Sequence, residues 1–126
     1  RQAGHLGFGP RWQVLRALWR GDGEGLAELS LDDAFAADVA AFGLHPALVD
    51  LATGFGLEVA PHYDPSVLWV PVAYRRVRVH GPLPARCFAS ARVHAARATG
   101  DVCTLDAVVT DAAGRVLVEV EGFSMK

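Results

Sequence analysis

The stretch that decides the fold is Leu44-His45-Pro46-Ala47-Leu48-Val49-Asp50-Leu51-Ala52-Thr53-Gly54-Phe55-Gly56. Pro46 suits the first turn of a helix, where its missing N–H costs nothing. The apolar run from Ala47 to Val59, ended by Pro61, predicts a helix that is buried nearly all round. One carboxylate, Asp50, interrupts this apolar surface. Because an aspartate is rarely buried without a partner or a chemical task, Asp50 is either a structural acid or a reagent.

The composition bounds the class of protein. The chain has 126 residues, of which 52% are hydrophobic and 21% charged, and this predicts one globular domain spanning 1–126. A net charge of -2 gives no reason to expect a nucleic-acid partner. No apolar run is long enough to cross a bilayer, so we expect no membrane partner. The glycine-rich start, Arg1–Arg11, lacks a signal peptide and reads like an interior segment of a longer polypeptide.

The two cysteines indicate a reducing compartment. Cys87 and Cys103 do not form a zinc pattern, and no metal site is expected. A hairpin turning near Gly100 would put Cys103 close to the turn and Cys87 far from it, so the two would not form a disulfide. A cytoplasmic location is the simpler interpretation.

Before the apolar stretch, the pattern predicts a hairpin and a short helix. Leu26–Leu31 alternates between apolar and polar residues, and Trp12–Trp19 is a strand or a short helix. Asp32 and Asp33 are good N-caps for a short amphipathic turn or helix that ends at Gly43.

After the apolar stretch, the pattern predicts strands only. Val67–Val79 is a long strand whose apolar parity changes, which requires a bulge near Tyr74–Arg76 or a bend at Pro71. Three alternating strands follow, near residues 87–95, 103–110 and 116–121. Because strands and helices do not alternate, the pattern does not predict a parallel sheet. We expect an α+β hot-dog fold, in which a curved antiparallel sheet wraps around one central apolar helix.

Three segments resemble the dehydratase domains of polyketide synthases. Gly7–Gln13 is similar to their Tyr-Gly-Pro-x-Phe motif, and Leu44–Asp50 to their His-Pro-Ala-Leu-Leu-Asp motif. Val70–His80 resembles their Leu-Pro-Phe-x-Trp-x-x-Val-x-Leu-His strand. The three segments occur in the same order as in the family, and this ordered set is a more specific sign of the family than any single segment.

The resemblance implies a partner domain. Family members are double hot-dogs, and this chain resembles only the second, C-terminal half. The first half carries a catalytic histidine in a His-x-x-x-Gly-x-x-x-x-Pro motif. His5 has Gly9 at the right offset, but Val14 stands where the proline is needed. The resemblance therefore implies three partners: an N-terminal hot-dog half that supplies the histidine, an acyl carrier protein and, as a further option, a second copy of the chain.

Two positions depart from the family pattern. Phe8 replaces a tyrosine and removes a hydroxyl. Gly54 stands four residues after Asp50, where the family usually has glutamine or histidine, and it offers no side-chain hydrogen bond.

By resemblance, Asp50 is the catalytic acid that protonates the hydroxyl leaving a 3-hydroxyacyl thioester. A carboxyl on an apolar helix can hold a proton near neutrality, because desolvation disfavours its charged form. We read His45 as structural and expect the Thr53 hydroxyl to bond within its own helix more readily than to substrate. The resemblance implies a set of substrate-binding residues: Phe8, Gly9, Pro10, Thr53, Gly54 and Pro71.

Two other groups of residues have competing interpretations. A basic stretch could guide an acidic carrier protein or could be an ordinary solvated sheet face, and we prefer the second: Arg75, Arg76, Arg78, His80 and Arg86. The tryptophans at positions 12, 19 and 69 are expected to be packing residues.

Three functions remain open. The leading hypothesis is the C-terminal half of a dehydratase, a hydro-lyase that forms enoyl thioesters on a carrier protein's phosphopantetheine arm with no bound cofactor. The second is a non-catalytic, dimerising hot-dog module, which Phe8 and Gly54 favour modestly. The third is a homodimeric hot-dog thioesterase in which Asp50 activates water.

Overall fold

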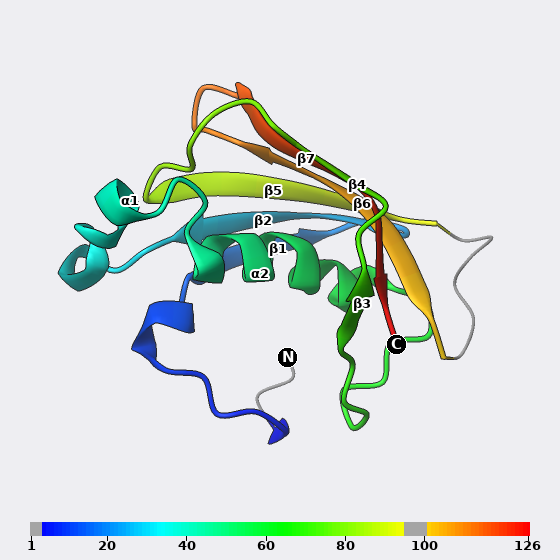
Figure 1. Cartoon of the computed structure of the whole chain (residues 1–126). Helices are drawn as coiled ribbons and strands as arrows, with labels where there is room; N and C mark the ends of the chain where they lie inside the picture. The colour runs from blue at the N-terminus through cyan, green and yellow to red at the C-terminus, as the bar shows by residue number, and fades with distance from the viewer. Residues whose placement is uncertain (1–3, 95–100) are drawn as a thin grey trace.

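The computed structural model describes residues 4–94 and 101–126. Within these residues seven strands form one antiparallel sheet in the order β1-β2-β5-β6-β7-β3, and β4 also pairs with β7. The strands are β1 (Leu15–Arg20), β2 (Glu24–Ser30), β3 (Pro71–Ala73), β4 (Arg76–Val79), β5 (Arg86–Val93), β6 (Cys103–Thr110) and β7 (Val116–Met125). Figure 1 shows the sheet curving over a single long helix, α2 (Pro46–Gly54). The α+β hot-dog prediction is therefore confirmed.

The central helix is shorter than the apolar run suggested. It begins at Pro46 as expected, but after Gly54 the chain tightens into a 3-10 helix, Phe55–Val59. Leu48 and Ala52 are buried against the sheet, whereas Asp50 on the opposite face is only half-buried. The prediction that this helix is buried all round is thus wrong for one face, because the sheet covers only the other.

Small residues on β5 let the helix approach the sheet. Cys87, Ala89 and Ala91 alternate inward and are buried. Gly56 makes the closest approach, since a Cβ placed there would lie 2.5 Å from Leu105 Cδ2 and 3.3 Å from Ala91 Cβ. The helical segment therefore packs tightly against the sheet because Gly56 lies against the small side chains of β5.

The predicted long strand is broken in two. β3 and β4 both pair with β7, and the interruption lies at 74–75, where Arg75 N–H donates to the carbonyls of Glu121 and Gly122 at 3.1 and 3.3 Å. Gly122 has φ +62, a conformation that few side chains tolerate. The expected irregularity near Tyr74–Arg76 is confirmed. The expected strand start at Val67 is wrong, because backbone pairing begins at Val70, which exchanges two hydrogen bonds with Lys126 at 3.0 Å, and β3 itself begins at Pro71.

The N-terminal elements follow the predicted order. β1 and β2 form the hairpin, and Asp32 caps the 3-10 helix Asp33–Phe35 by accepting from Ala34 N–H. A short helix, α1 (Asp38–Ala41), follows. Of the two alternatives for Trp12–Trp19, the strand is confirmed, because β1 begins at Leu15 and only Trp12 belongs to the preceding 3-10 helix, Pro10–Trp12.

The two cysteines are free and buried. Burial raises the pKa of the Cys87 thiol to about 11 and also raises that of Cys103. The turn expected near Gly100 lies outside the described residues.

Among residues 4–94 and 101–126, no single helix has the length and apolar character needed to cross a membrane. One helical pair bent by 101°, Asp33–Ala41 with Pro46–Val59, meets those criteria by length and composition only.

Candidate active site

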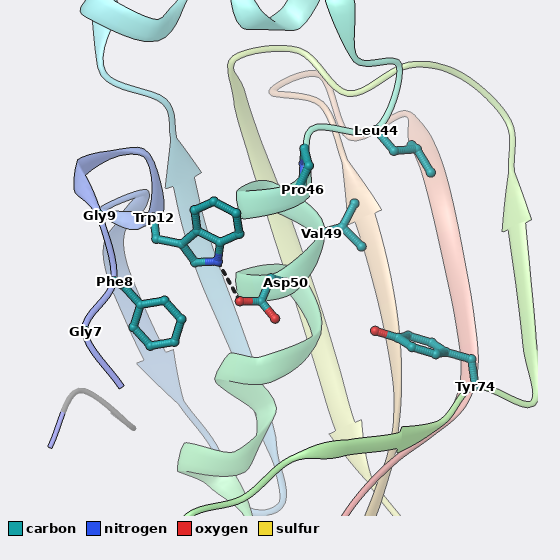
Figure 2. A pocket seen from close by; sticks show the side chains of 9 residues that line it. All are labelled: Gly7, Phe8, Gly9, Trp12, Leu44, Pro46, Val49, Asp50 and Tyr74. Atoms are coloured by element: carbon teal, nitrogen blue, oxygen red, sulfur yellow. Dashed lines mark hydrogen bonds between the residues drawn. The ribbon is translucent and has the colours of Figure 1, made fainter. Parts of the chain in front are cut away.

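A cavity of about 680 Å³ opens on the face of α2 that points away from the sheet (Figure 2). Its walls come from three parts of the chain: the segment before β1, the first turns of α2 and the break between β3 and β4. The lining residues are Gly7, Phe8, Gly9, Trp12, Leu44, Pro46, Val49, Asp50 and Tyr74. Apart from Asp50 and the ends of Trp12 and Tyr74, this lining is apolar.

Asp50 faces the cavity because of helix geometry. Leu48 and Ala52 are buried against the sheet, and a residue two positions from each lies about 200° around the helix. One oxygen of the carboxylate is held from the opposite wall, where Trp12 Nε1–H donates to Asp50 Oδ2 at 2.8 Å. Figure 2 shows the other carboxylate oxygen pointing into the cavity. Asp50 is therefore held at one oxygen and open at the other.

The segment that carries Trp12 is itself held in place. Trp12 N–H donates to Gly9 O at 3.0 Å, which closes the 3-10 turn that Pro10 begins. Arg11 donates to Asp38 Oδ2 at 2.7 Å, and its guanidinium lies 4.4 Å from the ring centroid of Phe35. The hydrogen bond from Arg11 lowers the pKa of Asp38. These contacts fix the wall of the cavity opposite α2.

Tyr74 forms the other wall, at the break between β3 and β4. Its ring packs against Phe123 with a centroid distance of 4.7 Å. In Figure 2 its hydroxyl points toward α2. Sequence reasoning did not single out Tyr74 for the site, although the irregularity predicted at this position was the available signal, because a strand break can redirect a side chain.

Trp12 is a second residue that sequence reasoning misplaced. We expected it to be a packing residue, but its indole faces Asp50 in the cavity. Of the other tryptophans, Trp69 is buried as expected, whereas Trp19 is 52% exposed and so is not a core residue. The difference arises because Trp12 sits on a turn outside the sheet, where strand alternation gives no guidance.

The structure brings some predicted site residues together and leaves others apart. Phe8 and Gly9 line the cavity with Asp50, whereas Pro10, Pro71 and the two α2 residues do not. The Thr53 hydroxyl donates to backbone carbonyls one turn back, at 3.1 and 3.3 Å, in agreement with the bond expected within its own helix. A Cβ on Gly54 would meet nothing within 4 Å. Substrate contact by these residues stays a prediction.

His45 is structural in its contacts. It is the N-cap of α2, and its buried ring accepts from Ala47 N–H at Nδ1, while Nε2 lies 3.4 Å from Asp38 Oδ2. Both ring nitrogens are thus occupied. None of the histidines in the described parts of the chain lines the cavity.

The basic stretch is paired with acidic residues along β7 and β2. Three arginines lie within salt-bridge distance of one carboxylate, Glu121, while His80 pairs with Glu119 and Arg86 with Glu28. Exposed ion pairs of this kind are typical of an ordinary solvated sheet face, although three arginines share one carboxylate and their charge is only partly offset.

A family model described as "Polyketide synthase dehydratase N-terminal domain" matches residues 2–126. The chain belongs to the polyketide synthase dehydratase family.

The curated relatives are much longer than this dehydratase chain. It is 33% identical to polyketide synthase GfsA of Streptomyces halstedii over 126 residues, covering 98% of the chain and 2% of that protein. It is 34% identical to erythronolide synthase EryA2 of Saccharopolyspora erythraea, covering 94% of the chain and 3% of that protein. The chain therefore spans a small part of these synthases.

Solved dehydratase domains share the fold. The dehydratase domain from the CurF module of curacin polyketide synthase superposes with a TM-score of 0.82 at 28% identity, over 94% of this chain and 41% of that one. A trans-AT dehydratase domain from Brevibacillus brevis gives 0.83 at 26% identity, over 96% and 42%. An N-terminal dehydratase from the difficidin assembly line gives 0.82 at 25% identity, over 99% and 46%.

The family match corrects one expectation. The matching family model is described as the N-terminal domain, so the assignment to the C-terminal half of a dehydratase is wrong. The physical reason for the error is that one hot-dog fold has the same element order wherever it stands in a tandem pair. Fold and hydrophobic pattern cannot separate two such halves, and the assignment rested on short motifs and an absent histidine pattern.

Proposed function

We propose that this domain forms part of a dehydratase site that removes water from 3-hydroxyacyl thioesters, and that Asp50 exchanges a proton with the departing hydroxyl. The observation that carries the proposal is the placement of Asp50: one carboxylate oxygen opens into a largely apolar cavity and the other is held by Trp12. An apolar cavity with few, convergent polar groups suits an acyl chain that bears one hydroxyl. Family membership supports the reaction class.

The chemistry requires two proton transfers. A base takes the proton from the carbon next to the thioester carbonyl, the C–O bond at the neighbouring carbon breaks, and an acid protonates the leaving hydroxyl to give water. The products are an enoyl thioester and water, so no electrons enter or leave. We assign the acid to Asp50 and expect the base to come from a group beyond the residues that line this cavity.

The wider assembly is part of the same proposal. The substrate arrives on the phosphopantetheine arm of an acyl carrier protein, a second hot-dog half completes the site, and the reaction itself needs no redox cofactor. The short share of each relative that the chain covers supports a place within a large modular synthase. We expect that synthase to work in the cytoplasm.

The test compares Asp50→Asn and Asp50→Glu in the intact synthase, with a 3-hydroxyacyl thioester and release of the enoyl product as the readout. Asparagine keeps the size of the side chain and its acceptor oxygen but cannot donate a carboxylic proton, so we expect turnover to fall about 100-fold or more. Glutamate retains an acid and should keep part of the activity. Unchanged turnover in Asp50→Asn would exclude Asp50 as the acid.

The alternative functions give different outcomes. A non-catalytic module would leave dehydration by the synthase unaffected by both substitutions at Asp50. A thioesterase would release free acid from the thioester instead of enoyl product.

A further inference from the structure

Trp12 holds one oxygen of the carboxyl group of Asp50. The distance from Trp12 Nε1 to Asp50 Oδ2 is 2.8 Å, which is a normal hydrogen-bond length. The indole belongs to the 3-10 helix Pro10–Trp12, and the carboxyl belongs to α2, 38 residues later in the chain. The bond therefore joins two walls of the cavity and is not a local contact within one element.

The chemistry of an indole makes this bond directional. The indole N–H is a donor and has no acceptor capacity. The oxygen that it contacts must therefore act as an acceptor, whether the carboxyl is ionised or protonated. The carbonyl oxygen of a carboxylic acid is a better acceptor than its hydroxyl oxygen, so when Asp50 is protonated this contact favours the proton on Oδ1, the oxygen that Figure 2 shows turned into the cavity.

We propose that Trp12 is a positioning residue that orients the Asp50 carboxyl and keeps its proton on the oxygen facing the substrate. This inference rests on the proposed function, because it assigns a task to a proton that dehydration uses. It also identifies Oδ1 of Asp50 as the oxygen that transfers the proton to the departing hydroxyl.

Gly54 offers a way to test the role independently of Trp12. It lies four residues after Asp50 on α2, so its side-chain position is on the same helix face as the carboxyl. Its φ of -66 and ψ of -28 are ordinary helical values, and an added Cβ meets nothing within 4 Å. A glutamine at this position can therefore donate its amide N–H to Asp50 from the neighbouring turn.

The experiment uses the intact synthase and the dehydration assay. Trp12→Phe keeps an aromatic ring but removes the N–H, and we expect kcat to fall roughly tenfold because the acid loses its fixed orientation. Adding Gly54→Gln to Trp12→Phe should restore kcat to within about threefold of wild type. Adding Gly54→Leu, which fills similar space without a donor, should restore nothing.

Two controls separate positioning from folding. Trp19→Phe makes the same chemical change at a tryptophan that is 52% exposed and does not line the cavity, so kcat should stay unchanged. The second control is thermal stability. Gly54→Gln and Gly54→Leu should change it similarly, so recovery of kcat by Gly54→Gln alone reports the hydrogen-bond donor and not the fold. A loss of kcat that follows protein yield or thermal stability, and that Gly54→Gln does not rescue, overturns the proposal.

A spectroscopic experiment tests the hydrogen bond between Trp12 and Asp50 even if the synthase does not dehydrate the thioester. Tryptophan-selective 15N labelling of the same protein reports indole N–H resonances, and the signal of Trp12 is the one that disappears in Trp12→Phe. Because hydrogen bonds to charged groups are stronger, this resonance should shift when Asp50→Asn replaces the carboxylate by an amide. An unmoved Trp12 resonance would overturn the proposal, whereas absent dehydration with a shifted resonance would overturn only the dehydratase function.

Discussion

Two glycines two residues apart should respond oppositely to alanine. Gly54 ends α2 with helical dihedral angles and has open space where an alanine methyl group would lie, whereas a methyl on Gly56 would lie 2.5 Å from Leu105 Cδ2. Leu105 is fully buried, and Ala91 Cβ at 3.3 Å blocks movement in a second direction. The same substitution is thus tolerated at one position and overpacked at the other.

The magnitudes follow from these distances. Gly54→Ala should raise the free energy of unfolding by about 0.4–1 kcal/mol, because alanine restricts the unfolded chain without straining the folded one. Gly56→Ala has a similar gain but must displace Leu105 or lift the 3-10 helix off β5, at a cost of about 1–3 kcal/mol. We expect a net loss of about 1–2 kcal/mol for Gly56→Ala, and a difference of about 1.5–3 kcal/mol between the variants.

Urea denaturation followed by tryptophan fluorescence measures this difference. The midpoint should rise for Gly54→Ala and fall for Gly56→Ala, with an unchanged m-value in both variants. If Gly56→Ala were as stable as Gly54→Ala, then the close contact between the helical segment and β6 would not govern stability, and the packing argument would be refuted.

Two further predictions concern the sheet. Burial raises the pKa of Cys87 to about 11 from the ordinary 9.0. Alkylation of this thiol at pH 8 should therefore be about 100-fold slower in the folded chain than in urea. Equal alkylation rates would show that the Cys87 thiol is not buried. Since the unfolded thiol loses its proton first, this group's contribution to stability is fully present below pH 9 and is lost as the pH rises toward 11, a decline that Cys87→Ala should reduce. Gly122→Ala should cost about 1–3 kcal/mol, because φ is +62 and the new Cβ would lie 2.8 Å from Arg75 Cβ. Gly114→Ala is the matched control, with φ +83 but open space, and should cost less in the same urea titration; a larger cost there would exclude the clash with Arg75.

Much of the fold could be predicted from local pattern. Pro46 and the apolar run after it determine where α2 begins, and period-two alternation identifies β5, β6 and β7. These features are visible in sequence because each depends on residues a few positions apart. The change of parity near Tyr74 likewise indicated a break in the strand, although the strand start was placed too early.

The site could be predicted only in part. Asp50 stood out as a lone acid on an apolar helix, and Phe8 and Gly9 were named through the family motif that precedes β1. The roles of Trp12 and Tyr74 were missed, since neither residue is exceptional within its own segment.

By itself, the sequence determined a hot-dog fold around one apolar helix and a single acid on that helix, because hydrophobic period and helix-start signals are local properties of the chain. The tertiary structure decided which face of α2 stays open, and that Trp12 reaches across 38 residues to hold one oxygen of Asp50. It also decided that Tyr74 faces the same cavity from the far edge of the sheet. The physical reason is that side chains from three separate segments meet only after the sheet has curved around the helix.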